Sequence, residues 1–356
     1  MPARPLNGLT LEELSEELQS RTRAVEALKW LYGLPELPER LPETNPEVSH
    51  RVWRPFASRH GVLTPRVRDR QVSPDGTTKY ALELHGATVE AVRIPSKDRS
   101  TVCISSQAGC TRRCAFCATK ELGFVRHLTA EEMVAQYMVA RAEAPRDKPA
   151  SNVVFMGMGE PFDNLDEVLR AVQVLTQGPV PQLRQVSVTV STSGVLPGLK
   201  RFLTESKASL ALSLNATTDE VRSQVMPHNR IWPIASLLDE LKRDAAASGG
   251  RRETLIEYVL FEGLNDSDDD ADRLVALLAE VPARVNLIPY NPYPGTTLRT
   301  PSEARVAEFH ERVVRQGQLC LVRWPRGREI AAACGQLVRS TGGAGFQPSS
   351  PTTPSS

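Results

Sequence analysis

From Ser100 onward, short β-branched or apolar runs alternate with longer segments of helical periodicity. We expect strands at 101–105, 152–156, 186–191, 209–214, 253–261 and 285–288, and helices at 129–143, 165–175, 196–203, 234–247, 268–278 and 302–316. Strands that alternate with helices form parallel sheets, because a parallel connection needs a crossover. Six such units predict an α/β fold whose sheet curls into a full or partial (β/α) barrel. In such barrels the functional groups gather at the carboxyl ends of the strands.

The chain before this series has a different character. Residues 8–32 read as two short helices, the first opened by a capping box of Thr10 and Glu13, and 33–46 form a proline-rich connector. A turn at Asp75-Gly76 then leads into a β-hairpin with strands at about 78–85 and 89–94. We therefore divide the chain into a small helical accessory domain with a basic segment (1–73), a β-hairpin extension (74–95), the barrel core (96–331), a cysteine-containing segment (332–341) and a Gly/Ser/Pro/Thr-rich tail expected to be disordered (342–356).

The segment from Arg51 to Arg70 contains six arginines and one acidic residue, Asp69. The formal net charge of the whole chain is only +1, so this segment is unusually basic. Trp53 and Phe56 lie among these arginines. Such a segment can bind RNA phosphates and stack on bases, or it can be the solvated face of a helical domain. We see no apolar run long enough to cross a membrane and no signal peptide, so we expect a cytoplasmic protein.

The cysteines are concentrated between Cys103 and Cys117, which hold four of the six in the chain. Cys110, Cys114 and Cys117 are separated by three and then two residues. Three thiolates on one loop can hold a 4Fe–4S cluster and leave one iron open to a further ligand. A structural zinc site that includes Cys103 is the alternative, although zinc ribbons usually present two separated Cys-x-x-Cys pairs. A disulfide framework is disfavoured by the low cysteine content.

A glycine-rich loop follows the second expected strand and reads Gly157-Met158-Gly159-Glu160-Pro161. Its glycines allow the backbone to approach a ligand closely, although a lone Gly-x-Gly is more often a plain turn. One βα unit after a three-cysteine loop, it resembles the loop of the radical S-adenosylmethionine (SAM) superfamily.

Five sequence motifs narrow this resemblance from the superfamily to one family. They are Cys-Ile-Ser-Ser-Gln-Ala-Gly-Cys (103–110), Phe-Met-Gly-Met-Gly-Glu-Pro (155–161), Val-Ser-Thr-Ser-Gly-Val-Leu-Pro (190–197), Asn-Leu-Ile-Pro-Tyr-Asn-Pro (286–292) and Ala-Ala-Cys-Gly-Gln-Leu (332–337). They are similar to those of the RlmN/Cfr family of RNA adenine methyltransferases and occur in the same order. The resemblance implies methylation of an adenine ring carbon, usually in 23S rRNA and in some members in tRNA. Carbon 2 is favoured, and carbon 8 is the alternative.

The resemblance also implies roles for single residues. Cys110, Cys114 and Cys117 would hold the cluster, and the SAM contacts would come from Gly159, Glu160, Ser191, Ser213, Leu214, Asn215 and Asn291. Glu90 would accept a proton, Cys334 would carry the methyl group as S-methylcysteine, and Cys103 would release the product through a transient disulfide with Cys334. Asn215 departs from the histidine that is usual in the family, and Cys320 matches no family cysteine and reads as a core residue.

The implied chemistry consumes two SAM molecules per turnover, one to methylate Cys334 and one to generate a radical. It needs an external electron donor such as flavodoxin, and we expect the enzyme to act as a monomer. A non-catalytic, zinc-stabilised RNA-binding module remains the alternative of a different class. It would account for the basic segment and the clustered cysteines, but not for Cys334, Glu90 or the glycine-rich loop.

Overall fold

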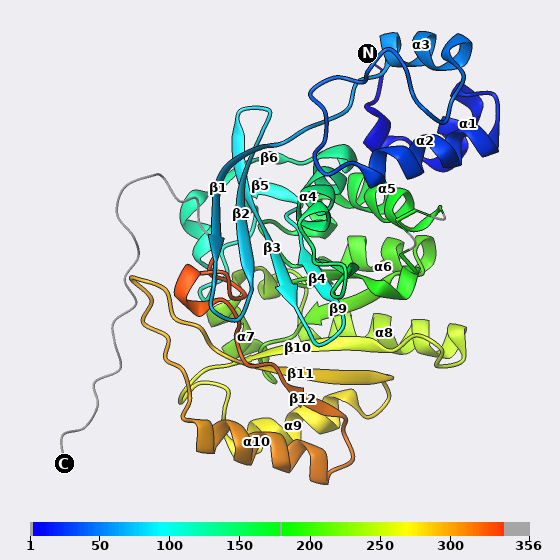
Figure 1. Ribbon diagram of the computed structural model, residues 1–356. Helices are drawn as coiled ribbons and strands as arrows, with labels where there is room; N and C mark the ends of the chain where they lie inside the picture. Colours follow the sequence, from blue (N-terminus) through cyan, green and yellow to red (C-terminus); the bar gives the residue numbers. More distant parts are fainter. Residues whose placement is uncertain (1–2, 179, 182, 338–356) are drawn as a thin grey trace.

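We describe a computed structural model of residues 3–178, 180–181 and 183–337 (Figure 1). The expected tail at 342–356 and the end of the cysteine-containing segment lie outside these described residues. The α-helices are α1 Leu11–Glu17, α2 Arg21–Gly33, α3 His50–Arg59, α4 Ala130–Ala142, α5 Leu165–Thr176, α6 Leu196–Glu205, α7 Asp219–Val225, α8 Ile234–Ser248, α9 Asp268–Leu278 and α10 Glu303–Arg315. Short 3₁₀ turns include η1 Leu6–Gly8, η2 Ala118–Leu122, η3 Pro161–Asn164, η4 Gln185–Ser187, η5 Pro227–Arg230 and η6 Arg328–Ile330.

The strands form one large sheet and one small hairpin. They are β1 Arg66–Val72, β2 Thr78–Leu84, β3 Ala87–Pro95, β4 Ser100–Cys103, β5 Gln107–Gly109, β6 Phe124–His127, β7 Ala150–Phe155, β8 Val188–Thr192, β9 Ser209–Ser213, β10 Thr254–Leu260, β11 Ala283–Pro289 and β12 Cys320–Val322. The ten-stranded sheet has the order β1-β2-β3-β4-β7-β8-β9-β10-β11-β12. Pairing is parallel from β4 to β12 and antiparallel from β1 to β4.

The parallel strands and their helices confirm the predicted α/β architecture. Within the described residues β12 pairs with β11 and not with β1, so the barrel is partial. The chain after β12 crosses toward the other edge, where η6 lies beside β1 and β2 (Figure 1). Three contacts hold it there: Arg326 Nη1 donates to Pro95 O at 2.6 Å, Gly327 N donates to Asp75 Oδ2 at 3.3 Å, and Ser73 Oγ donates to Glu329 Oε2 at 2.8 Å.

The segment 66–72 differs from our expectation, since it is strand β1 rather than the end of the helical domain. Its side chains are almost all exposed, as an edge strand permits, so hydrophobic alternation gave no sign of its extended conformation. The extension is therefore three antiparallel strands rather than a hairpin alone.

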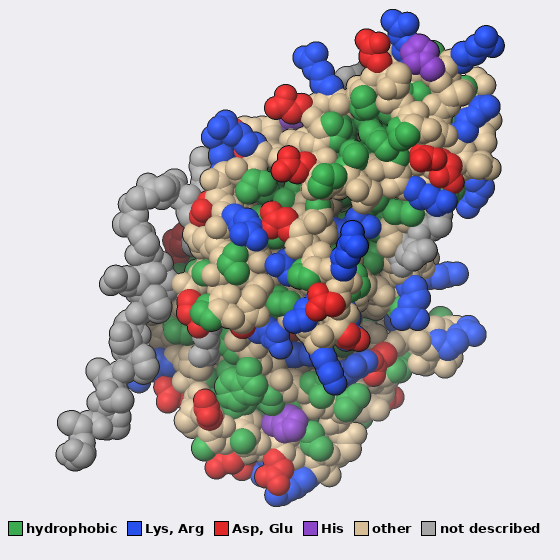
Figure 2. Space-filling view, in the orientation of Figure 1, with side chains coloured by type: hydrophobic (Ala, Val, Ile, Leu, Met, Phe, Trp, Pro, Cys, Tyr) green, Lys and Arg blue, Asp and Glu red, His purple; other side chains and the backbone are tan. Residues whose placement is uncertain are grey.

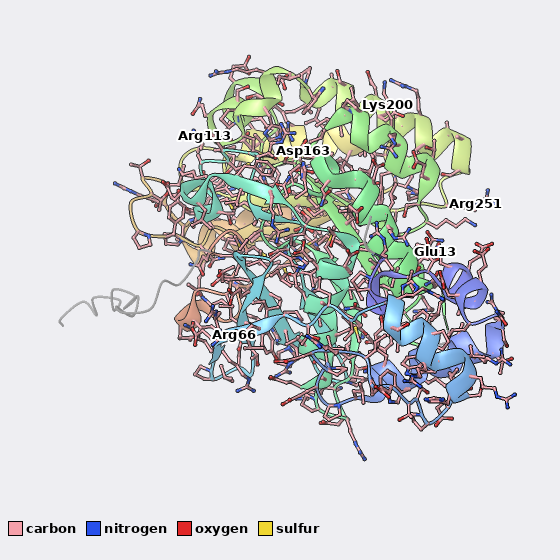
Figure 3. All side chains as sticks on the ribbon, turned by 90° about the horizontal axis from the view of Figure 1, so that it is seen from above. Glu13, Arg66, Arg113, Asp163, Lys200 and Arg251 are labelled. Atoms are coloured by element: carbon pink, nitrogen blue, oxygen red, sulfur yellow. The ribbon has the colours of Figure 1, made fainter. Side chains whose placement is uncertain are left out.

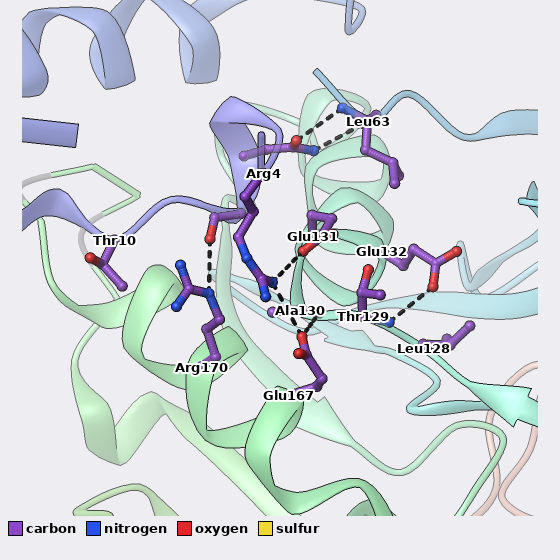
Figure 4. Close-up of polar contacts among 12 residues, drawn as sticks. Arg4, Thr10, Leu63, Leu128, Thr129, Ala130, Glu131, Glu132, Glu167 and Arg170 are labelled. Atoms are coloured by element: carbon purple, nitrogen blue, oxygen red, sulfur yellow. Dashed lines mark hydrogen bonds and ion pairs between the residues drawn. The ribbon is translucent and has the colours of Figure 1, made fainter. Parts of the chain in front are cut away.

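The N-terminal helices pack against α4 and α5 through a polar junction (Figures 3 and 4). Arg4 Nη1 donates to Glu131 Oε2 at 2.7 Å and to Glu167 Oε2 at 3.3 Å. Arg170 of α5 forms an ion pair with Glu13 of α1 and donates from Nε to Gly8 O at 3.2 Å. The predicted capping box of Thr10 and Glu13 is present, and at the start of α4 Thr129 N donates to Glu132 Oε2 at 2.9 Å. Specific hydrogen bonds therefore set the position of the accessory domain on the core.

Candidate functional site

A cavity lies at the carboxyl ends of the parallel strands, as the barrel prediction requires. It is lined by side chains of the cysteine loop, the glycine-rich loop, the ends of β8 to β11 and the C-terminal segment. Among them are Cys110, Cys114, Cys117, Gly159, Glu160, Ser191, Ser213, Asn215, Glu257, Asn291 and Cys334. The fold thus places residues that are far apart in the sequence around the same cavity.

The cysteine loop is shaped by its own backbone. Gly109, at φ +74°, ends β5, and a Cβ there would lie 1.8 Å from Gly123 O, so only glycine fits. Cys110 N donates to that same Gly123 O at 2.9 Å, and Ala115 N donates to Val225 O at 2.8 Å. The β5–β6 hairpin was not predicted, because strands of three and four residues carry too little pattern. It anchors the start of the cysteine loop, at Cys110, to Gly123.

The three cysteines of one short loop line the same cavity, as the ligands of a cube-shaped cluster must. Within the described ranges, no three His, Cys, Asp or Glu side chains are grouped closely enough to hold one metal ion. A 4Fe–4S cube takes each thiolate on a different iron, so its ligands surround a volume rather than a point. Burial raises the pKa of Cys110 to about 12 and also raises the pKa values of Cys114 and Cys117. A bound metal would reverse that effect, because it deprotonates a coordinating thiol.

Glu160 is held firmly at the cavity wall. Its Oε1 accepts hydrogen bonds from Thr192 Oγ1 at 2.8 Å and from Phe162 N at 3.0 Å, and its Oε2 accepts from Ser193 N at 2.8 Å and Ser193 Oγ at 2.6 Å. Burial raises the pKa of Glu160, and these hydrogen bonds act in the opposite direction. A Cβ on the preceding Gly159 would lie 2.6 Å from Gln107 Cβ, so this loop also requires glycine. A carboxylate placed in this way is suited to an amino group of a ligand.

Six of the seven expected SAM contacts line the cavity, and Leu214 does not. Its side chain is in the core, and its carbonyl accepts from Arg222 Nε at 2.9 Å. Asn215 has φ 59°, a left-handed conformation that asparagine tolerates better than most residues. Its Oδ1 accepts from Val259 N at 2.8 Å, which links the ends of β9 and β10. Asparagine at this position is therefore compatible with an ordered site.

Arg222 of α7 supports the cavity wall from behind, and the sequence analysis did not predict it. It is fully buried, and its guanidinium donates to the carbonyls of Ser193 at 2.7 Å, Ser213 at 3.0 Å and Leu214 at 2.9 Å. Burial lowers its pKa to about 10, while the nearby Cys114 raises it. Arg222 thus ties together the two loops that follow β8 and β9, and it places a positive charge near the cysteine loop. Helix α7 has only seven residues, so its periodicity gave no signal.

Cys334 reaches the cavity from the far end of the chain. The residues after it are tied to the cysteine loop: Ala118 N donates to Gly335 O at 2.7 Å, and Thr119 Oγ1 donates to Leu337 O at 2.9 Å across 218 residues of sequence. Cys334 is an exposed residue, but burial of its thiol, and then the charge of Glu257, raise the pKa of that thiol to about 11.

Cys103 and Glu90 lie beside the cavity rather than in its lining. Cys103 is the buried last residue of β4, and burial and the proximity of Cys334 raise the pKa of its thiol. Both cysteines are free thiols in this structure. Glu90 of β3 is fully buried and forms an ion pair with Lys79 of β2, with Nζ and Oε1 3.4 Å apart.

Glu257 is a second residue that the sequence analysis missed. It lies on β10, lines the cavity and accepts a hydrogen bond at 2.8 Å from Nδ2 of Asn286, its partner in the parallel register. Burial raises its pKa. The sequence could have revealed it, because Glu257 interrupts the otherwise mostly apolar strand Thr-Leu-Ile-Glu-Tyr-Val-Leu. Glutamate is rarely buried without a partner or a function.

A partial barrel with a three-cysteine loop and a glycine-rich loop at its mouth defines the class of radical SAM enzymes. Comparison with known proteins agrees, since residues 104–275 match the family model of the radical SAM superfamily. A solved structure, a radical SAM methyltransferase from Sphaerobacter thermophilus, is 36% identical with a TM-score of 0.84, covering 94% of this chain and 99% of that one.

The particular family follows from curated relatives. The dual-specificity RNA methyltransferase RlmN of Geobacter sulfurreducens is 41% identical over 93% of this chain and 91% of its own length. The protein of the same name from Paracoccus denitrificans is 42% identical over 95% and 90%. The chain belongs to the RlmN/Cfr family and is a SAM-dependent RNA methyltransferase. This membership excludes the non-catalytic zinc module, and it implies a 4Fe–4S cluster and SAM.

Proposed function

We propose that this enzyme methylates carbon 2 of an adenosine in 23S rRNA and that tRNA is a second substrate. The observation that carries the proposal is the single cavity lined by the three-cysteine loop and by Cys334. The curated relatives are named dual-specificity RNA methyltransferases, which supports more than one RNA substrate. They carry the name RlmN, which favours carbon 2 over the carbon-8 activity of the other branch.

The chain's own residues have separate tasks. Cys110, Cys114 and Cys117 would hold the cluster, and Gly159, Glu160, Ser191, Ser213, Asn215 and Asn291 would surround SAM, with Leu214 contributing through its backbone. When bound, the cluster and SAM supply the methyl group and the radical chemistry that an unreactive ring C–H bond requires, at a cost of two SAM molecules per turnover. Cys334 receives the methyl group and carries it to the base.

Release of the RNA falls to Glu90 and Cys103. With the RNA joined to Cys334 through a methylene bridge, Glu90 takes the ring proton, and the one unpaired electron left on the base would pass to an electron acceptor, a role that the bound cluster would supply. The Cys103 thiolate forms a sulfur–sulfur bond to Cys334, and the carbon–sulfur bond breaks with its electron pair kept by carbon. That carbon takes up a proton and becomes the methyl group, while a thiol reductant restores the two cysteines.

The same proposal includes an external electron donor such as flavodoxin and a monomeric enzyme that works in the cytoplasm. No helix in the part of the chain that the structure describes is long and apolar enough to cross a membrane.

The activity is tested on RNA nucleosides by liquid chromatography and mass spectrometry. RNA from a strain that lacks the gene should lose 2-methyladenosine from 23S rRNA and tRNA, and the gene should restore it. Restoration of 8-methyladenosine instead would move the enzyme to the other branch. Cys334→Ala should restore neither nucleoside, which separates the cysteine route from direct transfer.

The release step is tested with Cys103→Ala under anaerobic single-turnover conditions. The variant should methylate Cys334 and join to the RNA, and because it lacks the resolving thiol it should leave a protein–RNA adduct that survives denaturation. Cys320→Ala is the matched control, since Cys320 is a buried cysteine of β12 outside the cavity lining. Normal turnover by Cys103→Ala would disprove the resolving role.

A further inference from the structure

Arg222 of α7 carries a buried positive charge whose hydrogen-bond partners are neutral. Its side chain is fully buried, and besides the three carbonyls described above, its Nη1 donates to Asn229 Oδ1 at 2.7 Å. Burial lowers the pKa of Arg222 to about 10, so the guanidinium stays charged at neutral pH. The acidic residue Asp219 also acts on this charge, but its Oδ1 accepts from Asn229 Nδ2 and from Ile234 N, each at 2.9 Å. Among the residues that the structure describes, the guanidinium forms no ion pair.

Helix α7 brings that charge close to the cysteine loop. Ala115 N donates to Val225 O at 2.8 Å, and Cys114 packs with Val225 in one buried apolar cluster. Arg222 lies three residues before Val225, a spacing that places both on the same side of the helix. Burial raises the pKa of Cys114, and the charge of Arg222 opposes that effect. The guanidinium is therefore near enough to Cys114 to act on it through charge.

Each of the three cysteines expected to hold the cluster has a different cation near it. Burial raises the pKa of every one of these thiols, and a positive charge opposes burial at each. The pairs are Arg112 with Cys110, Arg222 with Cys114, and Lys120 with Cys117.

Arg222 differs from the other two cations in burial and in its partners. Arg112 forms an ion pair with Asp163, and Lys120 Nζ lies 3.7 Å from Glu121 Oε1. Both of these cations are also partly exposed, and exposed charges are screened more strongly than buried ones. The positive charge around the cysteine loop thus depends most on Arg222.

A fixed positive charge near an iron–sulfur cluster makes the cluster easier to reduce. Reduction adds one electron, so the reduced state is the more negative one and is stabilised more by a nearby cation. The reduction potentials of such clusters follow their net charge, the hydrogen bonds to sulfur and the exposure to solvent. A buried arginine behind one of the cysteines is therefore placed to change that potential.

We propose that Arg222 raises the reduction potential of the bound 4Fe–4S cluster by fixing a buried positive charge behind Cys114. Arg222 is not among the residues that line the cavity, so it acts through its charge and not by contact with SAM or RNA. No bond of Arg222 forms or breaks, and the electron comes from the external one-electron donor. The inference goes beyond the proposed function, since it rests on the cluster that family membership implies and not on the RNA substrate or the carbon that is methylated.

The test measures the reduction potential of the anaerobically reconstituted full chain without SAM or RNA. The chain is titrated with a one-electron reductant, and the reduced cluster is followed by electron paramagnetic resonance. Iron content, sulfide content and circular dichroism are recorded for each variant. Arg222→Gln removes the charge and keeps a hydrogen-bond donor, whereas Arg222→Lys keeps the charge. Arg230→Gln, at an exposed arginine of η5, is the matched control.

Arg222→Gln should make the cluster harder to reduce. At a fixed solution potential, the ratio of reduced to oxidised cluster should fall roughly 10-fold, which is a shift of about 59 mV for one electron. Arg222→Lys should keep most of the unmodified potential, and Arg230→Gln should not differ from the unmodified chain. Because a buried charge is screened only weakly, the effect of Arg222→Gln should persist when the salt concentration is raised from about 0.05 to about 0.5 M.

An unchanged potential in an Arg222→Gln variant that holds its full iron and sulfide would overturn the proposal. Equal shifts in Arg222→Gln and Arg222→Lys would also overturn it, because they would follow from the lost hydrogen bonds and not from the charge. If Arg222→Gln does not fold, Arg222→Met, which keeps the apolar stem, replaces it. If neither folds, Arg222→Lys decides: an unmodified potential supports a role of the charge, and an altered potential contradicts it.

This test is separate from those of the proposed function. An unchanged potential would leave RNA methylation and the role of Cys334 as they stand. Failure of the unmodified chain to bind any cluster would instead defeat the proposed function itself.

Discussion

At the scale of single residues, the thiol that would accept the methyl group lies in an environment that disfavours its reactive form. Burial first, and the Glu257 carboxylate second, raise the pKa of Cys334 to about 11. A thiol must lose its proton to be a nucleophile. The charge of Glu257 therefore limits the reactivity of Cys334 in the absence of bound cofactors.

Glu257→Gln should lower the pKa of Cys334, because it removes a negative charge that opposes thiolate formation. The glutamine can still accept the hydrogen bond from Asn286, so the fold should be retained. Alkylation of Cys334 by iodoacetamide, followed by peptide mass spectrometry from about pH 7 to 10, should become faster by a few-fold at each pH. Glu253→Gln, an exposed carboxylate just before β10 that pairs with Arg284, is the control. An unchanged pH profile would show that Glu257 does not act on this thiol.

At the scale of elements, the sequence predicted what local patterns encode. The six βα units follow from hydrophobic periodicity, and the capping residues Thr10 and Thr129 mark where two helices begin. Strand β12 has only three residues and depends on pairing with β11, so no local signal announces it. The residues of the site likewise fall into those that the sequence predicts and those that only the fold reveals. The cysteine and glycine loops are contiguous motifs, whereas Arg222 acts through carbonyls of two loops that only the folded chain brings together.

Trp53 and Phe56 correct a further expectation. Their place among the arginines suggests stacking on bases, but both are buried, and Trp53 Nε1 donates to Pro42 O at 2.8 Å. Their ring centroids are 5.4 Å apart, inside the helical domain. Amphipathic spacing on α3 explains the outcome, because the aromatic residues face inward and the arginines face outward.

Helix α4 supplies a stability prediction. Glu132 at its start is fully buried and accepts from Arg126 Nη1 and Nη2, each at 2.8 Å, and from Thr129 N at 2.9 Å. Burial raises its pKa, but these partners outweigh burial and lower it below 4.5. Glu132→Ala should destabilise the fold by about 1–3 kcal/mol, since it removes the carboxylate that accepts from Arg126 and from Thr129 N. Thermal unfolding measures this, with the exposed first-turn Glu220→Ala of α7 as the control.

The pH dependence of the same contact has a definite sign. A carboxylate whose folded-state pKa is depressed stabilises the fold fully above its unfolded value, and that contribution is lost as pH falls through the folded pKa. The difference in unfolding temperature between the unmodified chain and Glu132→Ala should therefore be largest above about pH 5 and shrink in acid. A difference that stays constant down to about pH 3 would contradict the assignment.

At the scale of the whole molecule, the basic segment is divided between two elements. Arg51, Arg54 and Arg59 are on α3, and Arg66, Arg68 and Arg70 are on β1. Among the described residues, ion pairs engage Arg59 with Glu17, Arg68 with Glu83 and Arg70 with Glu143. Basic side chains along the outer edge of the accessory domain are interspersed with acidic ones (Figure 2). These ion pairs neutralise part of the positive charge that the six arginines carry.

RNA binding can therefore be tested on arginines that differ in their partners. Arg51 and Arg54 are exposed on α3, where phosphates could replace water around them. If they bind RNA, Arg51→Glu with Arg54→Glu should weaken binding and reduce the slope of log affinity against log salt by about 0.7–0.9 for each phosphate that is no longer neutralised. Titrations of an rRNA fragment at several salt concentrations measure the slope. The charge-matched control for general repulsion is Lys200→Glu with Lys242→Glu, at an exposed lysine of α6 and at a partly exposed lysine of α8 that pairs with Glu280. An unchanged slope in the double variant would make this part of the accessory domain a solvated surface, and RNA recognition would then fall to the barrel mouth and the antiparallel extension.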